Sequence, residues 1–552
     1  MPPAVGNPRF GRLRRHRTLS VLAALVILAG VVSGGRWTYG RLFPPSLTCG
    51  TGMTATGTPL ACAGVNIDST PFTDHEPDRM RELEKAVKSA NDQVKGDYTS
   101  VVLMLDLSPV SDVDTLTYGS LYPNIEGALA AVWRANNTAA YGSTPAVKLY
   151  LANMGSQYGD WAVTVDKLKQ KVNTEHISAV IGLGQSTDQT RHAAAAISAQ
   201  LHIPVVGSTV TGDSMNIDPA DPTGKKQIAD LFRVSPTNSD SVVAATQYVS
   251  GLKPAVTSLA VVADSVTGDD YTQTLAAAAK TRFKAPNRTV TVLPYTSPSD
   301  LPAGSGRQDY LVQQFNLMHA NLCQAAPSVV YFAGRGHDLA AFVENWVQGA
   351  PCGIAQLHIL AGDDASESIH DKGVLDGIAS GRVTVAYTAL ASPDEWGTQC
   401  PGSDAKHNYD QFWAAFTGRP DPCTGQTLTA DKDVPMLSFD PTDLASGQAM
   451  LTHDAAVAAI SAGRRDAVGL RNPGLQTGIL HQFYCAQMLP GASGWLSFGS
   501  DGTPAGKPAP VVQLGSDGTT RTIALTWPPD GTPNLSLPQR GGKGAPGCPN
   551  GG

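Results

Sequence analysis

The sequence predicts an α/β protein of two lobes, each built on a doubly wound parallel sheet, and three observations lead to this fold class. The chain has 552 residues with 42% hydrophobic side chains, which is more than one core of about 250–300 residues accommodates. From Tyr98 onward, short β-branched runs alternate with Ala-rich amphipathic stretches, as βα units do. The alternation then begins again in a second series of similar size. We therefore expect two similar lobes joined by several chain crossings that form a hinge.

Each series contains four βα units. In the first series we expect strands at 100–107, 147–152, 177–183 and 203–207 and helices at 121–136, 161–172 and 188–200. In the second we expect helices at 239–250, 271–283, 309–324 and 338–348 and strands at 259–263, 290–294, 328–333 and 357–360. After an extended run at 383–390, we place helices at 408–417 and 445–462 on the first lobe and strands at 495–498 and 511–514 on the second.

The expected domain limits follow from these elements. The first lobe takes residues 97–236 and 384–484, and the second takes 237–383 and 485–526. The hinge crossings then lie near Pro236, Val383 and Cys485. We expect residues 36–96 to form a stalk with one helix at 76–94, and residues 527–552 to be a tail rich in Pro and Gly.

The N-terminus carries an export signal. Residues 1–18 are basic, and the uncharged apolar run that starts at Leu19 extends with small residues to Gly35. Its length lies between a cleaved signal core and a spanning helix, so cleavage after Ser33 and retention as a membrane anchor both remain open, and we favour retention. The preceding arginines would stay inside the cell and place everything after Trp37 outside the cytoplasmic membrane, anchored or secreted.

The exported part is acidic. The whole chain has a formal net charge of −7, and the residues before Pro44 contribute seven positive charges and no negative ones, so the remainder carries −14. Phosphate binding needs clustered Lys and Arg on the folded domain. This charge excludes nucleic acid as the partner.

Eight cysteines follow the export signal, and we expect disulfides outside the cell. Sequential pairing is our expectation because each pair would close a short loop or pin the tail, although the sequence does not fix connectivity. The candidates are Cys49, Cys62, Cys323, Cys352, Cys400, Cys423, Cys485 and Cys548. No CxxC occurs and no cysteine has zinc-ligand spacing with histidine, so we expect no metal site.

Neither catalysis nor a cofactor is indicated. The chain has no Gly-x-Ser-x-Gly elbow, no His-Glu-x-x-His motif and no convincing Cys–His pairing. Its half-match to a dinucleotide fingerprint after Gly182 lacks the third glycine. We expect a protein that is not an enzyme.

Candidate ligand-binding residues follow the strands of the first series, because ligands of open parallel sheets bind at the carboxyl ends of strands. Gly182-Leu-Gly-Gln-Ser-Thr-Asp188 opens a helix and offers Ser186 and Thr187 at its positive end, which suits a carboxylate. Plain helix capping is the alternative. Gly207-Ser-Thr-Val-Thr-Gly-Asp213 adds Thr209 and Thr211, or is simply a turn.

The second series offers three corresponding loops, which begin at Asp264, Gly334 and Gly362. We expect their residues Tyr271, Arg335 and Asp364 to face the first lobe. A half-buried packing ring for Tyr271, a solvated charge for Arg335 and helix capping by Asp363 and Asp364 are the alternatives.

A series of motifs resembles the type I periplasmic binding proteins, in particular the branched-chain amino acid and related extracellular ligand-binding receptors. The resemblance covers roughly residues 97–515 and depends on the order of the motifs, none of which is diagnostic alone. They are Ala179-Val-Ile-Gly-Leu-Gly-Gln-Ser186, Ile203-Pro-Val-Val-Gly-Ser-Thr209, Leu231-Phe-Arg-Val-Ser-Pro-Thr-Asn-Ser-Asp240, Leu259-Ala-Val-Val-Ala-Asp264, Val329-Val-Tyr-Phe-Ala-Gly334 and Gly494-Trp-Leu-Ser-Phe-Gly-Ser-Asp-Gly502.

The resemblance implies a ligand whose carboxylate meets Ser186, Thr209 and Thr211 while Tyr271 and Asp364 recognise its ammonium. Arg335 departs from the family pattern, which often has an aromatic residue there, and as a free cation it would suit an additional anionic group on the ligand. The implied function is capture of an amino acid or related carboxylate for an ABC permease by a monomeric protein. A membrane-tethered ligand sensor is the alternative.

Overall fold

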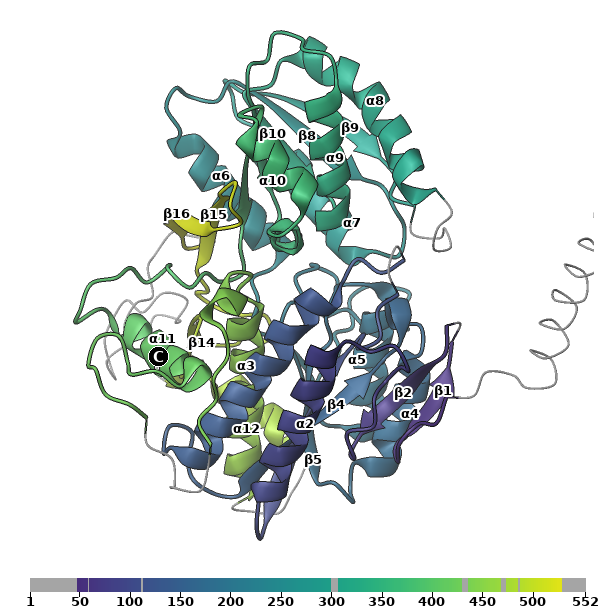
Figure 1. Ribbon diagram of the computed structural model, residues 1–552, viewed down its shortest axis with the longest axis vertical. Coiled ribbons are helices and arrows are strands. Elements are labelled where there is room, and N and C mark those ends of the chain that lie inside the picture. The colour runs from purple at the N-terminus through teal and green to yellow at the C-terminus, as the bar shows by residue number, and fades with distance from the viewer. Residues whose placement is uncertain are drawn as a thin grey trace, which may run out of the picture. The chain divides into compact units, whose positions relative to one another are not determined.

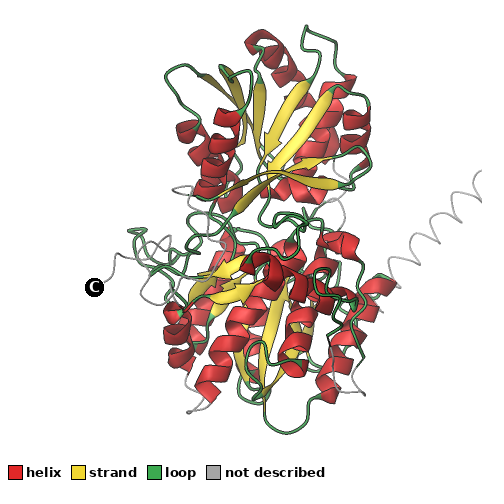
Figure 2. Ribbon diagram, turned by 90° about the vertical axis from the view of Figure 1, so that its left-hand side faces the viewer, coloured by secondary structure: helices red, strands yellow, loops and turns green. Residues whose placement is uncertain are grey.

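The computed structural model describes residues 47–57, 59–110, 113–298, 306–428, 435–467, 473–484 and 487–528. The chain divides into two units after Thr48, and everything reported below belongs to the unit that begins at Cys49. This unit contains two seven-stranded sheets in separate lobes (Figure 1). Helices lie on both faces of each sheet (Figure 2).

The first sheet is parallel from β4 onward and antiparallel at one edge. Its order is β1-β2-β4-β3-β5-β6-β7. Strands β3 and β5 are almost entirely buried, as expected for parallel strands covered on both faces. The bounds are β1 Met53–Thr56, β2 Ala61–Asn66, β3 Tyr98–Leu105, β4 Ala146–Asn153, β5 Ile177–Gly182, β6 Val205–Gly207 and β7 Leu231–Arg233.

The second sheet repeats this plan. Its order is β16-β15-β12-β11-β10-β8-β9, with parallel pairing from β9 to β12 and antiparallel pairing of β15 and β16. The bounds are β8 Ser258–Asp264, β9 Thr289–Tyr295, β10 Val329–Ala333, β11 Leu357–Ala361, β12 Val383–Thr388, β15 Ala509–Leu514 and β16 Thr520–Thr526. The expected α/β class with two doubly wound lobes is confirmed.

The helices distribute between the lobes in chain order, with one exception. The first lobe has α2 Asp78–Gln93, α3 Tyr118–Asn137, η1 Ser156–Tyr158, α4 Trp161–Lys171 and α5 Asp188–Leu201. The second has α6 Asn238–Gly251, α7 Asp270–Arg282, α8 Arg307–Ala325, α9 Gly336–Gln348, η2 Asp363–Ser368 and α10 Lys372–Ala379. The exception is the later helices, which return to the first lobe. They are α11 Asp404–Thr417, η3 Pro441–Leu444, α12 Gln448–Ala467 and α13 Pro473–Gln482.

Helix α12 packs closely against α3 and β5. A Cβ atom at Gly127 of α3 would lie 2.1 Å from the backbone oxygen of Ala449, so only glycine allows this approach. The other end of α12 is held by Arg464, whose guanidinium donates to the backbone oxygens of Ala135, Gly142 and Pro145. The helix therefore runs from the lobe interface, at Gln448, to loops at the far end of the first lobe.

The structure corrects three of the expected limits. The described part of the expected stalk, residues 47–57 and 59–96, belongs to the first lobe, because β2 pairs with β4 and α2 packs on α3. The crossing expected near Val383 comes later, because β12 belongs to the second sheet up to Thr388. Residues 495–498 do not close that sheet, because the hairpin of β13 (Leu489–Gly491) and β14 (Gly494–Leu496) contacts α11 and α12 of the first lobe.

Three of the four expected disulfides are present. They join Cys49 to Cys62, Cys323 to Cys352 and Cys400 to Cys423. Cys485, Cys548 and the apolar segment at 19–35 lie outside the described residues. Within the described part of the chain, no helix is both long and apolar enough to cross a bilayer.

We expect the disulfide between Cys323 and Cys352 to stabilise the second lobe. It links α8 to the segment after α9 across a sequence separation of 29, so it restricts the unfolded chain. Replacing both cysteines by alanine should lower the free energy of unfolding by about 2–4 kcal/mol, measured by urea denaturation. An unchanged midpoint would show that the bridge does not form.

Candidate functional site

The carboxyl ends of the parallel strands in both sheets lead to one cavity between the lobes. This inner chamber has a volume of about 40 Å³. The first lobe lines it with Leu105, Leu116, Leu121, Asn124, Gly184, Gln185, Ser186, Thr209, Thr211, Ser446 and Gln448, and the second lobe with Tyr271, Arg335, Asp363, Asp364, Ser366 and Glu367, while Leu390 comes from the crossing between them. Six of the seven expected site residues are therefore together, and the exception is Thr187.

A tight turn after β5 delivers Ser186 to the inner chamber. Gly184 has a φ of +75°, and a Cβ there would lie 2.4 Å from the Tyr158 hydroxyl, so the turn requires glycine. The Ser186 hydroxyl accepts hydrogen bonds from the backbone N–H groups of Thr211 and Gly212, both at 2.9 Å. Its own hydrogen stays available to donate to a ligand.

The neighbouring threonines have different tasks. Thr187 caps α5, where its hydroxyl accepts from the backbone N–H of Thr190 at 3.3 Å, as the capping alternative anticipated. The Thr209 hydroxyl donates to the backbone oxygen of Gly184 at 2.9 Å. The Thr211 hydroxyl is buried and has no hydrogen-bond partner among the described residues, so it is the threonine hydroxyl that is free for a ligand.

Arg335 does not offer an uncompensated charge. Its guanidinium makes two hydrogen bonds of 2.8 Å to the Asp269 carboxylate and one of 3.0 Å to Asp364. It also lies over the Tyr271 ring, 4.5 Å from the ring centroid. This geometry is a correction to the role expected for Arg335 as a partner for an additional anionic group, because the second lobe already neutralises it.

The two neighbouring aspartates also differ. Both Asp364 oxygens are engaged, one by Arg335 and the other by the backbone N–H of Gly336 at 2.7 Å. Asp363 has a buried Oδ1 with no partner. Burial, together with the neighbouring Asp364, raises the pKa of Asp363 to about 8. Asp363 therefore presents the unpaired carboxyl oxygen to the inner chamber.

Glu367 bridges the lobes. Its carboxylate accepts hydrogen bonds from the Ser120 hydroxyl on α3 and the Gln448 side-chain amide on α12. The Gln448 oxygen in turn accepts from Asn124 at 2.8 Å. Burial raises the pKa of Glu367 to about 7. Three side chains from distant segments thus hold the closed cleft.

Sequence reasoning did not select Gln185, Asp363, Asn124, Glu367 or Gln448. Gln185 lies inside the motif Gly182-Leu-Gly-Gln-Ser-Thr-Asp188, and the sequence pattern at Asp363 is that of a helix cap. The other three have no local signal, because Glu367 and Gln448 are 81 residues apart and Asn124 and Gln448 are 324 apart.

A second cavity, the outer chamber, adjoins the inner one and has a volume of about 280 Å³. The two share Leu116, Gln185 and Arg335. The rest of the outer chamber is lined by Asp106, Val113, Asp114, Thr115, Gln157, Tyr158, Thr187, Asp188, Gln189, Val266, Thr267, Gly268, Asp269, Ser297 and Arg307. Thr187 therefore belongs to the outer wall of the cleft.

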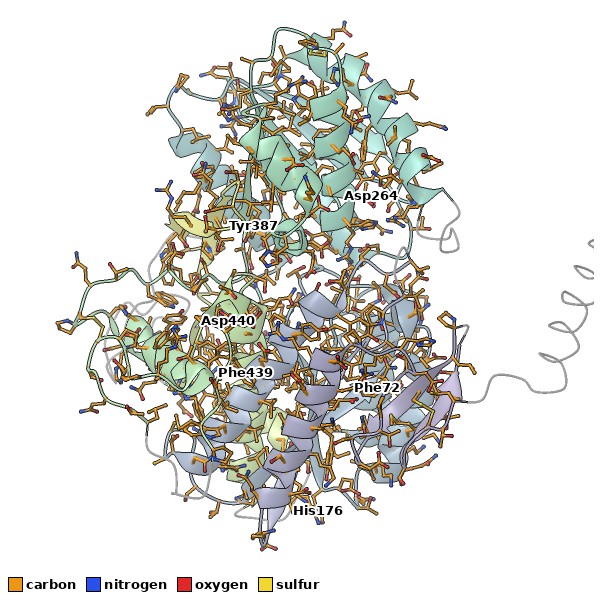
Figure 3. The ribbon with its side chains drawn as sticks, viewed as in Figure 1. Phe72, His176, Asp264, Tyr387, Phe439 and Asp440 are labelled. Carbon is orange, nitrogen blue, oxygen red and sulfur yellow. A yellow bond between two sulfur atoms is a disulfide. The ribbon has the colours of Figure 1, made fainter. Side chains whose placement is uncertain are left out.

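A larger cavity lies elsewhere. It measures about 770 Å³ and is lined by residues such as Tyr98, His176 and Ile177, and Figure 3 shows His176 at the pole of the first lobe away from the second. These residues are at the amino ends of β3 and β5, whereas open parallel sheets bind ligands at their carboxyl ends. The cleft is therefore the better candidate site.

One group of side chains in the described part of the chain has metal-ligand spacing. It comprises His319, Cys323 and Cys352. The two cysteine sulfurs are bonded to each other, and a disulfide sulfur is not the thiolate that binds metals. The arrangement therefore does not fit a metal ion.

Comparison with known proteins gives matches among solved structures alone. No family model and no curated protein matches the chain. A leucine binding protein from Thermotoga maritima superimposes with a TM-score of 0.54 and 16% sequence identity, covering 78% of this chain and 99% of that one.

Two further structures match over the same share of the chain. The first is a branched-chain amino acid transporter substrate binding protein from Streptococcus pneumoniae in complex with isoleucine. It superimposes with a TM-score of 0.53 and 16% sequence identity, covering 78% of this chain and all of that one. The second is a solute binding protein of an ABC transporter from Rhodopseudomonas palustris in complex with p-hydroxybenzoic acid. It superimposes with a TM-score of 0.53 and 12% sequence identity, covering 78% of this chain and 97% of that one. The chain thus has the two-lobed fold of the type I periplasmic binding proteins, as its motifs led us to expect.

Proposed function

We propose that this protein is an extracytoplasmic solute-binding protein that captures an amino acid or related carboxylate between its lobes and catalyses no reaction. The observation that carries the proposal is a set of buried polar atoms around the inner chamber without partners in the described structure: Gln185 Nε2, Thr211 Oγ1 and Asp363 Oδ1. Buried polar atoms are normally hydrogen-bonded, and a ligand would satisfy all three.

The unpaired atoms on the two lobes suit ligand groups of opposite charge. Gln185 and Thr211 join Ser186 as donors on the first lobe, which suits a carboxylate. Asp363 offers an unpaired carboxyl oxygen on the second lobe, and an ammonium beside it would favour its charged form despite its raised pKa. In this arrangement Thr209, Tyr271, Arg335 and Asp364 line the site and hold its shape, and Thr187 fixes the start of α5.

The lobes must separate for a ligand to enter. A volume of about 40 Å³ is little more than the roughly 30 Å³ that one water molecule occupies in the liquid. Backbone hydrogen bonds also cross the cleft, from Tyr271 to the Ser186 oxygen at 3.2 Å and from Asp188 to the Gly268 oxygen at 3.0 Å. Closure around a ligand is the movement that such hinged lobes perform.

Import through an ABC permease is the biological role we propose, with the protein acting as a monomer on the outer face of the cytoplasmic membrane. The solved neighbours are named as transporter components, and this supports the proposal. Ligand sensing by a tethered protein is the second candidate, favoured by the basic N-terminus and the apolar run that follows it. Loss of ligand uptake in a deletion strain supports import, and unchanged uptake favours sensing.

The two threonines provide a matched test of the carboxylate site. Thr211→Val removes the free hydroxyl and should weaken ligand binding about 10- to 100-fold, because a hydrogen bond to a charged group is worth about 1.5–3 kcal/mol. Isothermal titration calorimetry measures the change. Thr211→Ser keeps the hydroxyl and should bind nearly as well as the parent. If the parent and Thr211→Val bind the ligand with equal affinity, the Thr211 hydroxyl does not contact the ligand.

The two aspartates test the ammonium site. Asp363→Asn should weaken α-amino acids at least tenfold, because a charge-assisted hydrogen bond is lost, and should leave the corresponding deaminated acids unaffected. Asp364→Asn should weaken both kinds of ligand and lower the melting temperature, because Arg335 and Gly336 lose their partner. Titration with each amino acid and its deaminated analogue separates these effects. Identical behaviour of the two variants would contradict the assignment.

Closure itself should be visible in solution. We expect the radius of gyration from small-angle X-ray scattering to fall when ligand binds, because the open lobes come together.

Glu367→Ala, which removes the bridge to Ser120 and Gln448, should weaken binding about tenfold, at the lower end of what hydrogen bonds to a charged group contribute. Glu344→Ala on the exposed side of α9 is the control. A bound protein with an unchanged radius would rule out closure.

A further inference from the structure

We infer that the cleft selects ligands with a net positive charge, namely amino acids whose side chain carries its own ammonium or guanidinium group and reaches from the inner into the outer chamber. This inference depends on the proposed function, since it places the amino acid's carboxylate and α-ammonium in the inner chamber. It adds the chemical class of the side chain.

The volumes require a ligand that extends outward. The inner chamber, at about 40 Å³, must already widen to take the carboxylate and the α-ammonium, whereas the adjoining outer chamber offers about 280 Å³ for a side chain. Small-molecule sites begin at about 300 Å³, so the outer chamber supplies most of the usable space. Gln185 and Leu116 line both chambers and mark the passage between them.

The lining of the two chambers is strongly acidic. It contains seven carboxyl groups and two guanidinium groups, and no Lys or His. The carboxyl groups belong to Asp106, Asp114, Asp188, Asp269, Asp363, Asp364 and Glu367, and the guanidinium groups to Arg307 and Arg335. A cleft lined by one sign of charge attracts ligands of the opposite sign.

The two cations are already neutralised within the second lobe. Arg335 is paired with Asp269 and Asp364. Arg307 is paired with Asp338, at 3.0 Å, and Asp338 lies just behind the chamber wall. Asp188 is likewise paired with Arg191, at 2.8 Å, so the acidic excess of the lining belongs to its carboxyl groups that have no ion-pair partner.

Four lining carboxyl groups form no ion pair with any described side chain: Asp106, Asp114, Asp363 and Glu367. Asp114 accepts hydrogen bonds from the backbone of Val110 and Gln157 and from the Ser156 hydroxyl, at 2.6–2.7 Å. Asp106 is only 1% exposed. Burial and the charge of Asp114 raise the pKa of Asp106 well above its usual value. A buried carboxyl group with a raised pKa keeps its proton. A ligand cation beside Asp106 would replace that proton and stabilise the charged carboxylate.

An unpaired carboxyl oxygen also points to a ligand at the same cleft. Asp363 is only 8% exposed and its Oδ1 has no partner in the described structure, so the inner chamber has an unsatisfied acceptor in addition to the acidic wall. A neutral aliphatic side chain would leave the carboxyl groups of the outer chamber unmatched, and an acidic one would be repelled. The few apolar lining residues, such as Leu116, Val113 and Val266, suit the methylene stem of a basic side chain.

The test uses ligand pairs that differ in charge and little else. The full-length chain is titrated calorimetrically with arginine and citrulline, whose side chains differ in a guanidinium and a neutral ureido group, and with lysine and norleucine. We expect each cationic ligand to bind at least tenfold more tightly than its neutral partner. Equal or tighter binding of citrulline and norleucine would overturn the inference.

A variant locates the effect. Asp106→Asn keeps the shape of the side chain and should lower the arginine-to-citrulline affinity ratio at least threefold, while citrulline affinity changes less than twofold. Asp166→Asn, which removes an exposed carboxylate outside the cleft, is the control for net charge and should leave the ratio unchanged. An unchanged ratio in Asp106→Asn, or an equal fall in the control, would contradict a role for the outer chamber. If Asp106→Asn fails to fold, the ligand pairs on the parent protein decide.

The outcomes also separate this inference from the proposed function. Tight binding of neutral amino acids with no preference for cations would leave the solute-binding function in place and refute the charge selection. Absence of saturable binding for every amino acid and deaminated acid tried would refute the proposed function itself.

Discussion

The buried guanidinium of Arg335 is the interaction on which the second half of the site depends. Asp269, one of its partners, caps α7. Arg335 itself precedes α9, and Asp364 lies in the first turn of η2. One charge cluster thus fixes the starts of three helices, and through them the positions of Tyr271 and Asp363. Removing one partner of such a buried cluster is costly because it leaves an uncompensated charge, so the cluster confers rigidity on a cleft wall that would otherwise consist of loops.

The first half of the site is held in another way. No ion pair supports Ser186 or Thr211; backbone geometry does, through the glycine turn after β5 and the two N–H groups that bind the Ser186 hydroxyl. Neutral donors on one lobe and fixed charges on the other make the two walls chemically unlike. A zwitterion bound between them would therefore have one favoured orientation.

Much of the fold was accessible from the sequence because the parallel strands are buried on both faces and appear as unbroken apolar runs, as in β3, β5 and β10. The strands that were missed lie at or near sheet edges. β1 and β16 are partly exposed and rich in threonine, so they lack that signal. The cysteine order was informative because each confirmed pair closes a local loop.

The site was accessible only in part. Loops at the carboxyl ends of strands identified Ser186, Thr211 and Tyr271, because topology brings such loops together. The compensation of Arg335 was not accessible, since its partner Asp269 is 66 residues away and only the packed lobe shows that they meet. The same limit applies to Glu367 and Gln448, whose contact exists only when the lobes are closed.

The return of α12 to the first lobe has a consequence for the order in which the protein acquires its structure. Helix α3 finds its main packing partner more than 300 residues later in the chain, after the whole parallel part of the second sheet. The first lobe therefore keeps an apolar face uncovered until residue 467 has been synthesised, whereas the strands β8 to β12 form a nearly contiguous unit. This delay exposes a nascent chain to aggregation, so the first lobe is the one most in need of protection before synthesis of the chain reaches the end of α12.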